Sequence, residues 1–352
     1  MNKMYIRRYK QEYNQALKDI FKTIYPSNPR LQENNYLNWQ FRDNPYNKDN
    51  DYTIWILEDS SQIKGFYGWI PVELFLKGRY SKSCEPILWW TADDAKGHGI
   101  QLLGNIIQKF PINLFHGCNQ QSFEVFKQFD IPCFSLSRFI GIIDLQYVAS
   151  IFKIKLTENF NNDSKRLKKI SEKANLDSIS LINRFETNEE MTFDSFKELE
   201  ARLRYTSNYL NWRYVDIPEC NYQIIKGTKH GEYCIFRIEK IKHYDVSVMR
   251  IIECSFGPDT IQNAIGFLFQ ESFKNNVILM DFFCSYKKIG NLFEQHGFGS
   301  CDKQYYNIIP YLFRPICNSM ELIICINGNG TTINDKKWYI TKGNGDMDRV
   351  KL

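Results

Sequence analysis

The sequence predicts an α+β protein built from two tandem copies of one unit, each a mixed sheet flanked by helices. Three observations predict this fold. The chain has 352 residues, which suits about two domains of ordinary size. An eleven-residue segment that begins at Asn35 recurs at Asn208, an offset of 173 positions, with seven identical residues. Strand-like and helix-like hydrophobic patterns also follow both copies in a similar order.

The elements of the first half are predicted from hydrophobic periodicity, with alternation for strands and a 3.6-residue period for helices. A short first strand leads to helical segments, and three strand-like runs precede a helix. In chain order we expect a strand at 4–9, a helical pattern at 13–25, strands at 52–58, 63–76 and 83–91, a helix at 99–110, a strand at 112–118, a helix at 121–129 and a strand at 133–144.

The second half repeats this pattern after a polar, charged segment at 155–176 that we interpret as a connector. A weaker correspondence sets 122–128 against 289–295. The tail, 338–349, is expected to be extended and then irregular. The domains are therefore predicted at 1–150 and 177–352, with a linker at 151–176. The second-half elements are predicted as a helix at 191–203, strands at 234–238 and 246–254, a helix at 260–274, a strand at 277–284 and a helix at 289–296.

The composition limits the classes of function. With 43% hydrophobic and 24% charged residues the chain is an ordinary globular protein, which excludes collagen-like, coiled-coil and disordered classes. The net charge of +5 is spread along the chain and does not form the dense basic face of a nucleic-acid binder, so no nucleic-acid partner is predicted. Acidic or phosphorylated small molecules remain possible ligands.

The cysteines and histidines carry no metal or disulfide signature. The ten cysteines lie in apolar runs without a C-x-x-C pair, so we expect reduced core thiols. None of the five histidines has zinc-site spacing, and no metal is predicted. The first residues turn polar quickly, and no apolar run approaches about 18 residues. We therefore predict a cytoplasmic protein without a membrane partner.

A strand that runs through a glycine turn into an amphipathic helix is the most informative stretch. Gly97 and Gly99 are expected to permit positive φ and to bring backbone N–H groups close to a ligand, while the helix directs its positive end at the same point. This combination suits an anion such as a pyrophosphate, to which Lys96 would add a point charge. A plain strand-to-helix turn is an equally open interpretation.

The order of elements, the Gly97-His98-Gly99 turn and the following Leu102-Leu103 pair resemble the GCN5-related N-acyltransferase (GNAT) fold, whose glycine turn holds the pyrophosphate of coenzyme A (CoA). The family's R/Q-x-x-G-x-G/A motif can be aligned with this turn in two ways. In the first alignment Asp94 replaces the Arg or Gln, and in the second Gln101 replaces the last glycine. The resemblance implies that the following cofactor-binding residues contact acyl-CoA: Trp90, Thr91, Ala92, Lys96, Gly97, His98, Gly99, Ile100, Asn119, Ser122 and Phe126.

The second half keeps the pattern of the fold but lacks the glycine turn. Its equivalent segment, 254–260, contains Pro258, which removes a hydrogen-bond donor, and has no second glycine. We expect that it does not bind CoA. Residues 292–298 nevertheless resemble the family's L-F-x-x-x-G-F segment, so the resemblance covers most of the chain.

Tandem chains of this size with one degenerate half resemble the N-acyltransferases that act on nucleotide-linked amino-dideoxy sugars, such as the anthrose-type or 3-amino-3,6-dideoxyhexose enzymes of polysaccharide and O-antigen biosynthesis. This resemblance implies transfer of an acyl group from acetyl-CoA or a 3-hydroxyacyl-CoA to the amino group of a dTDP-linked sugar. The amine would attack the thioester directly, through a tetrahedral intermediate.

Such a transfer needs a neutral amine, a donor for the oxyanion and a route for the proton. Asp94 and Asp93, beside the predicted helix start, are the first catalytic candidates, although residues before a helix most often serve as caps. Cys84, Glu85 and His116 are second choices. A histidine in an apolar strand is more often a satisfied core residue than a catalytic one, and the core is an open alternative for Cys84 as for the other cysteines.

Two further classes of function stay open. A tandem GNAT chain can take its acyl group from charged tRNA, but that would call for a large basic surface, which the charge distribution does not support. The chain can also be a binding module without catalysis. The surviving glycine turn in one half argues weakly against complete loss of activity.

Overall fold

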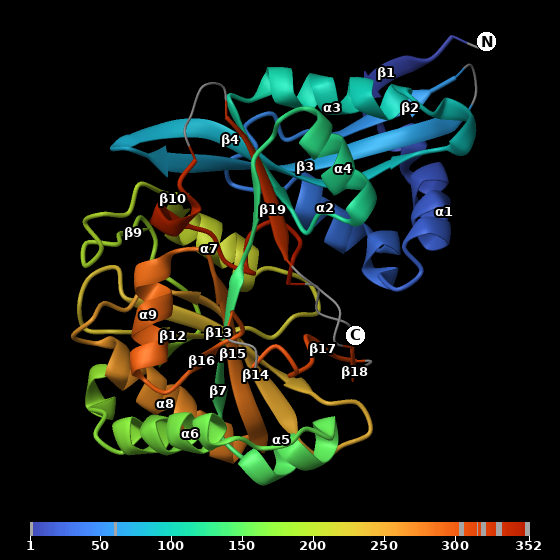
Figure 1. Cartoon of the computed structure of the whole chain (residues 1–352). Coiled ribbons are helices and arrows are strands. Elements are labelled where there is room, and N and C mark those ends of the chain that lie inside the picture. The colour runs from blue at the N-terminus through green and yellow to red at the C-terminus, as the bar shows by residue number, and fades with distance from the viewer. Residues whose placement is uncertain are drawn as a thin grey trace.

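The computed structural model describes residues 3–59, 62–302, 306–314, 316–317, 322–328 and 333–348. The described residues form two large mixed sheets with helices packed against them, and two small two-stranded sheets, β9 with β11 and β17 with β18 (Figure 1). The first half consists of β1 (Tyr5–Arg8), α1 (Asn14–Ile24), α2 (Asn34–Phe41), β2 (Ile54–Glu58), β3 (Ile63–Leu76), β4 (Arg79–Thr91), α3 (His98–Lys109), β5 (Ile112–His116), α4 (Gln120–Gln128) and β6 (Cys133–Ser135).

The rest of the chain begins with β7 and ends with a short strand near the carboxyl end. Its elements are β7 (Ser137–Ile142), α5 (Leu145–Phe152), α6 (Glu158–Ser171), β8 (Ser180–Ile182), β9 (Glu190–Met191), β10 (Ala201–Leu203), β11 (Tyr205–Thr206), α7 (Ser207–Tyr214), β12 (Gln223–Lys226), β13 (Tyr233–Lys240), β14 (Ser247–Cys254), α8 (Ile261–Lys274), β15 (Val277–Cys284), α9 (Lys287–Gln295), β16 (Gly299–Ser300), β17 (Leu312–Phe313), β18 (Ile316–Cys317), β19 (Ile323–Gly328) and β20 (Trp338–Tyr339).

Both correspondences found in the sequence fall on matching helices. The ends of α2 and α7 are offset by 173 residues, the spacing of the recurring segment. The ends of α4 and α9 are offset by 167 residues, the spacing of the weaker correspondence. The predicted duplication of one α+β unit is therefore confirmed.

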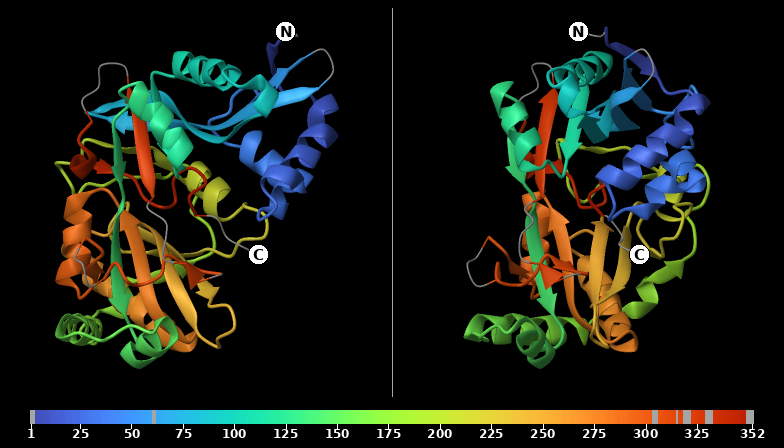
Figure 2. Two further views of the ribbon diagram at one scale, coloured as in Figure 1. Left: turned by 45° about the vertical axis from the view of Figure 1, so that its right-hand side comes forward. Right: turned by 90° about the vertical axis from the view of Figure 1, so that its right-hand side faces the viewer.

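The two sheets exchange strands. The first sheet has the order β1-β2-β3-β4-β5-β19-β6, so a strand from near the carboxyl end lies between β5 and β6. The second sheet has the order β16-β7-β15-β14-β13-β12-β8, so β7, which follows β6 directly in the chain, belongs to the other unit. Figures 1 and 2 show the chain passing from the upper sheet into β7 of the lower sheet and β19 lying in the upper sheet, where it pairs with β5. This exchange crosses the domain boundary predicted near residue 150.

Helices cover both faces of the first sheet, and α1 and α3 each pack on it through one apolar stripe. Leu102, Leu103 and Ile106 of α3 are buried and pack with Tyr67 and neighbouring residues on one face. On the other face α1 buries Leu17 and Phe21, and α2 is largely buried beside them. The alternation of side chains along β3 supplies both faces.

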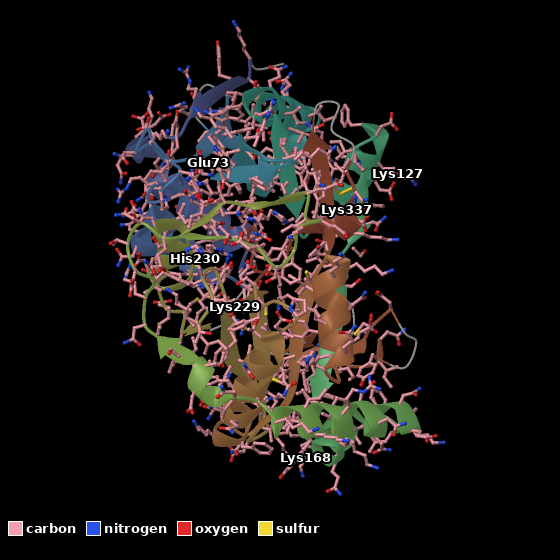
Figure 3. All side chains as sticks on the ribbon, turned by 90° about the vertical axis from the view of Figure 1, so that its left-hand side faces the viewer. Glu73, Lys127, Lys168, Lys229, His230 and Lys337 are labelled. Carbon is pink, nitrogen blue, oxygen red and sulfur yellow. A yellow bond between two sulfur atoms is a disulfide. The ribbon has the colours of Figure 1, made fainter. Side chains whose placement is uncertain are left out.

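Three predicted elements differ in the structure. The helix expected at 191–203 is wrong: Ala201–Leu203 form β10, which pairs with β3 and is buried along its whole length. The strand expected at 133–144 is divided between the two sheets. Most of the polar connector is α6, whose Phe160 and Leu167 are fully buried while Lys168 faces outward (Figure 3). Its charged residues are therefore the solvent face of a packed helix.

The cysteines are not all reduced thiols. Cys133 of β6 and Cys325 of β19 form a disulfide across directly opposed strand positions. The prediction failed because the two residues lie 192 positions apart, and only the strand exchange brings them together. Within the described parts of the chain, no helix is long and apolar enough to cross a membrane.

Candidate functional site

Strands β4 and β5 diverge and leave a gap in the first sheet. They pair only at Ser83 with Ile112 and at Cys84 with Asn113. Further along, β4 contains a bulge at Leu88, whose φ of 52° is unusual for a leucine, and the register to β3 shifts at this point. The bulge bends β4 away from β5, so the gap widens toward the carboxyl ends of both strands.

A cavity of about 380 Å³ occupies this gap. Its walls come from β4 and β5, from the start of α4, from the end of α1 and from residues near the carboxyl end. The lining residues are Tyr25, Tyr67, Pro86, Ile87, Leu88, Trp89, Phe115, His116, Gly117, Cys118, Asn119, Ser122, Phe126, Leu322, Asp346 and Met347.

The two adjacent tryptophans of β4 face opposite sides of the strand. Trp89 lines the cavity, stacks on Tyr67 with 5.4 Å between ring centroids and lies 6.3 Å from Phe126. Trp90 packs on Phe66 on the other face and is not among the lining residues. Trp89 therefore supplies the aromatic wall that a ligand in the gap would contact.

The glycine turn begins α3 at one end of the gap. Gly97 has a φ of 93°, as predicted, and occupies the position before α3 without any side chain capping the helix. The expectation of positive φ is wrong for Gly99, which lies inside the first turn of α3. A Cβ there would lie 3.3 Å from the Thr91 side chain and 3.4 Å from the Trp89 side chain, so α3 packs closely on β4 at this glycine and a larger residue would require these side chains to shift slightly.

The residues around the turn are not among those that line the cavity. Lys96 is largely exposed and lies 3.2 Å from Asp93, and Ile100 is also exposed. His98 bonds Gln101 within α3. The backbone N–H of Ala92 donates to the carbonyl of Lys64 and is therefore already engaged in the sheet.

Asp93 and Asp94 lie outside the cavity, in a short turn of 3₁₀ helix before Gly97. The Asp94 carboxylate lies 2.7 Å from the ammonium of Lys64, and this hydrogen-bonded partner lowers the pKa of Asp94. The side chain of Asp94 is 62% exposed and that of Asp93 is 98% exposed. Both carboxylates thus lie outside the cavity, where they pair with Lys64 and Lys96.

Glu85 and His116 form a buried pair at the cavity wall. Glu85 lies on β4 and His116 ends β5, and the imidazole Nε2 is 2.9 Å from the carboxylate Oε1. Both side chains are at most 1% exposed. Cys84 instead faces α3 and contacts the Asn113 side chain. Burial raises the pKa of the Cys84 thiol well above its usual value, which keeps the thiol neutral.

The start of α4 forms the opposite wall. The Asn119 side chain caps α4 by accepting a hydrogen bond from the backbone N–H of Ser122, at 2.8 Å. Asn119, Ser122 and the buried Phe126 all line the cavity. Among the sequence-predicted residues, the structure therefore brings His116, Asn119, Ser122 and Phe126 together, with Glu85 behind the histidine.

The tail segment, residues 338–348, contributes to the same cavity, and sequence reasoning missed it. Asp346 and Met347 line the cavity, and a Cβ on Gly345 would lie only 2.7 Å from the His116 ring. Arg213 of α7 holds this part of the tail by donating to the carbonyls of Gly343 and Gly345. The repeated glycines were the available signal, because they mark a segment that approaches another chain closely.

The equivalent gap in the second sheet is filled by the tail segment. β14 and β15 pair from Ser247 to Ile251 and then separate. Tyr339 accepts the N–H of Cys254 with its hydroxyl group, and Thr341 bridges to Cys284 of β15. Figure 2 shows the tail between the two sheets. The chain itself thus takes the place that stays open in the first sheet.

The buried carboxyl of Glu253 anchors this filling. It accepts hydrogen bonds from the hydroxyls of Tyr339 at 2.9 Å, Thr341 at 2.8 Å and Tyr214 at 2.9 Å. Burial raises the pKa of Glu253 to about 7 against the effect of these donors. Within the described residues, no group of three or more histidine, cysteine or acidic side chains is arranged to hold a metal ion.

Comparison with solved structures agrees with the fold. A protein from Enterococcus faecalis, described as of unknown function and a probable N-acyltransferase, has a TM-score of 0.55 at 9% identity, over 93% of this chain and 72% of its own. A GCN5-related N-acetyltransferase from Anabaena variabilis has a TM-score of 0.52 at 11% identity, over 92% and 72%. No protein-family profile and no curated protein matches the sequence. The chain therefore has the GNAT fold, in two copies.

Proposed function

We propose that this protein is an N-acyltransferase that takes its acyl group from acyl-CoA and passes it to a primary amine. The observation that carries the proposal is the open gap between β4 and β5, which ends at a glycine turn and the uncapped start of α3. Two solved structures with this fold, a probable N-acyltransferase and an N-acetyltransferase, support the same class of reaction.

The residues of the first half fit a CoA thioester. The positive φ of Gly97 and the absence of a capping side chain leave the first backbone N–H groups of α3 free to face a pyrophosphate. Lys96, at the same turn, supplies a mobile positive charge. The pantetheine arm would lie along β4 in the cavity, against Trp89 and the start of α4, and would bring the thioester toward His116.

The second half is proposed not to bind CoA. Its gap contains Tyr339 and Thr341, both bound to the buried Glu253, so a pantetheine arm would have to displace the tail segment. One CoA molecule per chain is therefore expected, and the second lobe serves to hold the tail against the first cavity.

The acceptor is proposed to be the amino group of a dTDP-linked amino-dideoxy sugar. The cavity offers aromatic surfaces, Tyr25 and Trp89, on which a sugar or base ring can pack. Acetyl-CoA and 3-hydroxyacyl-CoA are the proposed donors. The cavity volume of about 380 Å³ suits a pantetheine end with a short acyl chain and a sugar amine better than a long fatty chain.

Calorimetric titration with acetyl-CoA and with desulfo-CoA tests the donor. We expect one binding site per chain. If neither acetyl-CoA nor desulfo-CoA binds, the proposal is refuted. Product formation is then followed by mass spectrometry with dTDP-linked 3-amino- and 4-amino-dideoxyhexoses. A parallel reaction offers charged tRNA as the alternative donor. If transfer occurs from charged tRNA and not from acyl-CoA, the protein is an aminoacyl-tRNA-dependent transferase instead.

A further inference from the structure

The buried pair of Glu85 and His116 contains two polar atoms with unmet hydrogen-bonding capacity. Glu85 Oε2 and His116 Nδ1 have no hydrogen-bond partner within the described part of the chain, although both atoms are buried. Native structures rarely leave such atoms unpaired, and the exceptions concentrate at functional sites. His116 is among the residues that line the cavity, but its side chain is 0% exposed, so the unpaired nitrogen lies just behind the wall of the proposed site.

Glu85 determines which imidazole nitrogen can accept a proton. An ionised Glu85 carboxylate would accept the hydrogen bond at 2.9 Å, which would place the imidazole hydrogen on Nε2. Nδ1 would then keep its lone pair and could act as a base, and the neighbouring carboxylate would stabilise the cation formed when that base takes a proton.

The tail segment fixes the position of the ring. Gly345 lies so close to His116 that a Cβ there would stand 2.7 Å from Cδ2 and 3.0 Å from Cγ. Arg213 holds this turn through the carbonyls of Gly343 and Gly345. The ring is therefore clamped between a carboxylate on β4 and a backbone turn held by α7, which limits rotation to other geometries.

We propose that His116 is the proton acceptor of the transfer and that Glu85 is its positioning residue. This inference rests on the proposed function. His116 Nδ1 takes a proton from the acceptor ammonium, and the amine lone pair forms the C–N bond at the thioester carbonyl. The C–S bond then breaks, the nitrogen gives its second proton to the departing CoA thiolate, and His116 releases its proton to solvent. One thioester and one ammonium yield one amide, one CoA thiol and one proton.

The chemistry of the unpaired atoms favours an ammonium over an anion as the second ligand. Both are acceptors when the pair is in the state described, so the site lacks donors, and a primary ammonium carries three. Other charged or titratable groups lie around the pair. They are Tyr25 at the end of α1, Tyr67 on β3, Cys118 after β5, Tyr209 and Arg213 on α7, and Asp346 in the tail segment.

The tautomer can be tested without turnover. Long-range ¹⁵N–¹H spectra of the full-length protein should show His116 protonated at Nε2 and unprotonated at Nδ1 at neutral pH. Glu85→Gln should mix the two tautomers. A His116 ring that carries its hydrogen on Nδ1 in the wild-type protein would overturn the assignment, whatever the outcome of the CoA titration.

Kinetics with acetyl-CoA and the dTDP-amino sugars test the role in the reaction. His116→Gln should lower kcat by about 100-fold or more and remove the acidic limb of the pH profile of kcat/KM, because a general base contributes at least this factor. The calorimetric affinity for acetyl-CoA should change by less than about threefold. Glu85→Gln should lower kcat by roughly tenfold and leave KM nearly unchanged.

A matched variant distinguishes the role of His116 from the loss of any histidine. His230→Gln changes an exposed histidine on a turn of the second half, away from the cavity (Figure 3), and should retain wild-type kcat. Normal kcat in a folded His116→Gln protein would refute the inference while leaving acyl transfer intact. If the wild-type protein does not bind acetyl-CoA, the proposed function is refuted instead. If His116→Gln fails to fold, His116→Asn and the tautomer spectra decide.

Discussion

Trp39 and Trp212 donate their indole N–H groups to each other's backbone carbonyl oxygens, at 2.7 and 2.8 Å. Their rings stack with 5.2 Å between centroids. The two residues are equivalent positions of the internal repeat, so the contact is reciprocal, as at the axis of a two-fold symmetric dimer. The recurring Asn-Trp segment is therefore the surface through which the two copies recognise each other.

Replacing Trp39 by Phe should destabilise the protein by about 1–3 kcal/mol, because it leaves the buried carbonyl of Trp212 without its donor. Trp212→Phe should have a similar effect. Since the residues are in direct contact, the double variant should lose less than the sum of the two. Urea unfolding of the four proteins measures this coupling, and strict additivity would show that the two contacts act independently.

Gly97→Val should weaken acetyl-CoA binding, because a φ of 93° is unfavourable for a branched residue and the turn would have to rearrange. The matched control is Gly104→Ala within α3, where an added Cβ meets nothing within 4 Å. That change should stabilise α3 by about 0.5–1 kcal/mol and leave binding unchanged. Calorimetry and melting curves read both effects. If the two variants bind acetyl-CoA with equal affinity, the glycine turn is not part of the binding site.

Glu253 should make the protein less stable as the pH rises from about 5 to 7. Its carboxyl group has a pKa near 7 when folded and 4.5 as the ordinary value, so between these values the folded state binds more protons than the unfolded state. The contribution of this group to the unfolding free energy is present below pH 4.5 and falls by about 3 kcal/mol as the pH passes 7.

The measurement compares wild type with Glu253→Gln, so that the other titrating groups largely cancel. The difference in unfolding free energy between the two proteins should shift in favour of the variant as the pH rises from 5 to 7. If this difference stays constant from pH 5 to 7, the pKa of Glu253 in the folded protein does not lie above its ordinary value within this range.

Reduction of the disulfide should lower the melting temperature. Cys133 and Cys325 close a loop of 192 residues, and a bridge over a long loop typically contributes about 2–4 kcal/mol. The double variant Cys133→Ser with Cys325→Ser should match the reduced wild type and should not respond to dithiothreitol. A dithiothreitol effect that persists in this variant would assign the change to another cysteine.

The elements next to the glycine turn could be predicted because local patterns specify them. The periodicity of α3 matches its burial, the long apolar run of β3 is buried at consecutive positions, and the copies of the repeat fall on α2 and α7. The tail segment could not be predicted in its place. Its turn at Gly345 is fixed by Arg213, more than one hundred positions earlier, and no local pattern encodes such a contact.

The catalytic candidates show the same division. Asp93 and Asp94 were favoured because they stand beside the turn in sequence, but they lie at its outer side. Glu85 and His116 are thirty-one positions apart and meet only because β4 and β5 are neighbours. Pairing between strands, which periodicity does not give, decides which side chains share a cavity.

The place of β19 between β5 and β6 sets an order of events during synthesis. A strand that is added near residue 328 completes a sheet that begins at residue 5, and Asp346 and Met347 close the cavity later still. On the ribosome the amino-terminal half therefore emerges long before its sheet can be finished. The cavity in this gap acquires its full set of walls only after residues 322–347 have been synthesised.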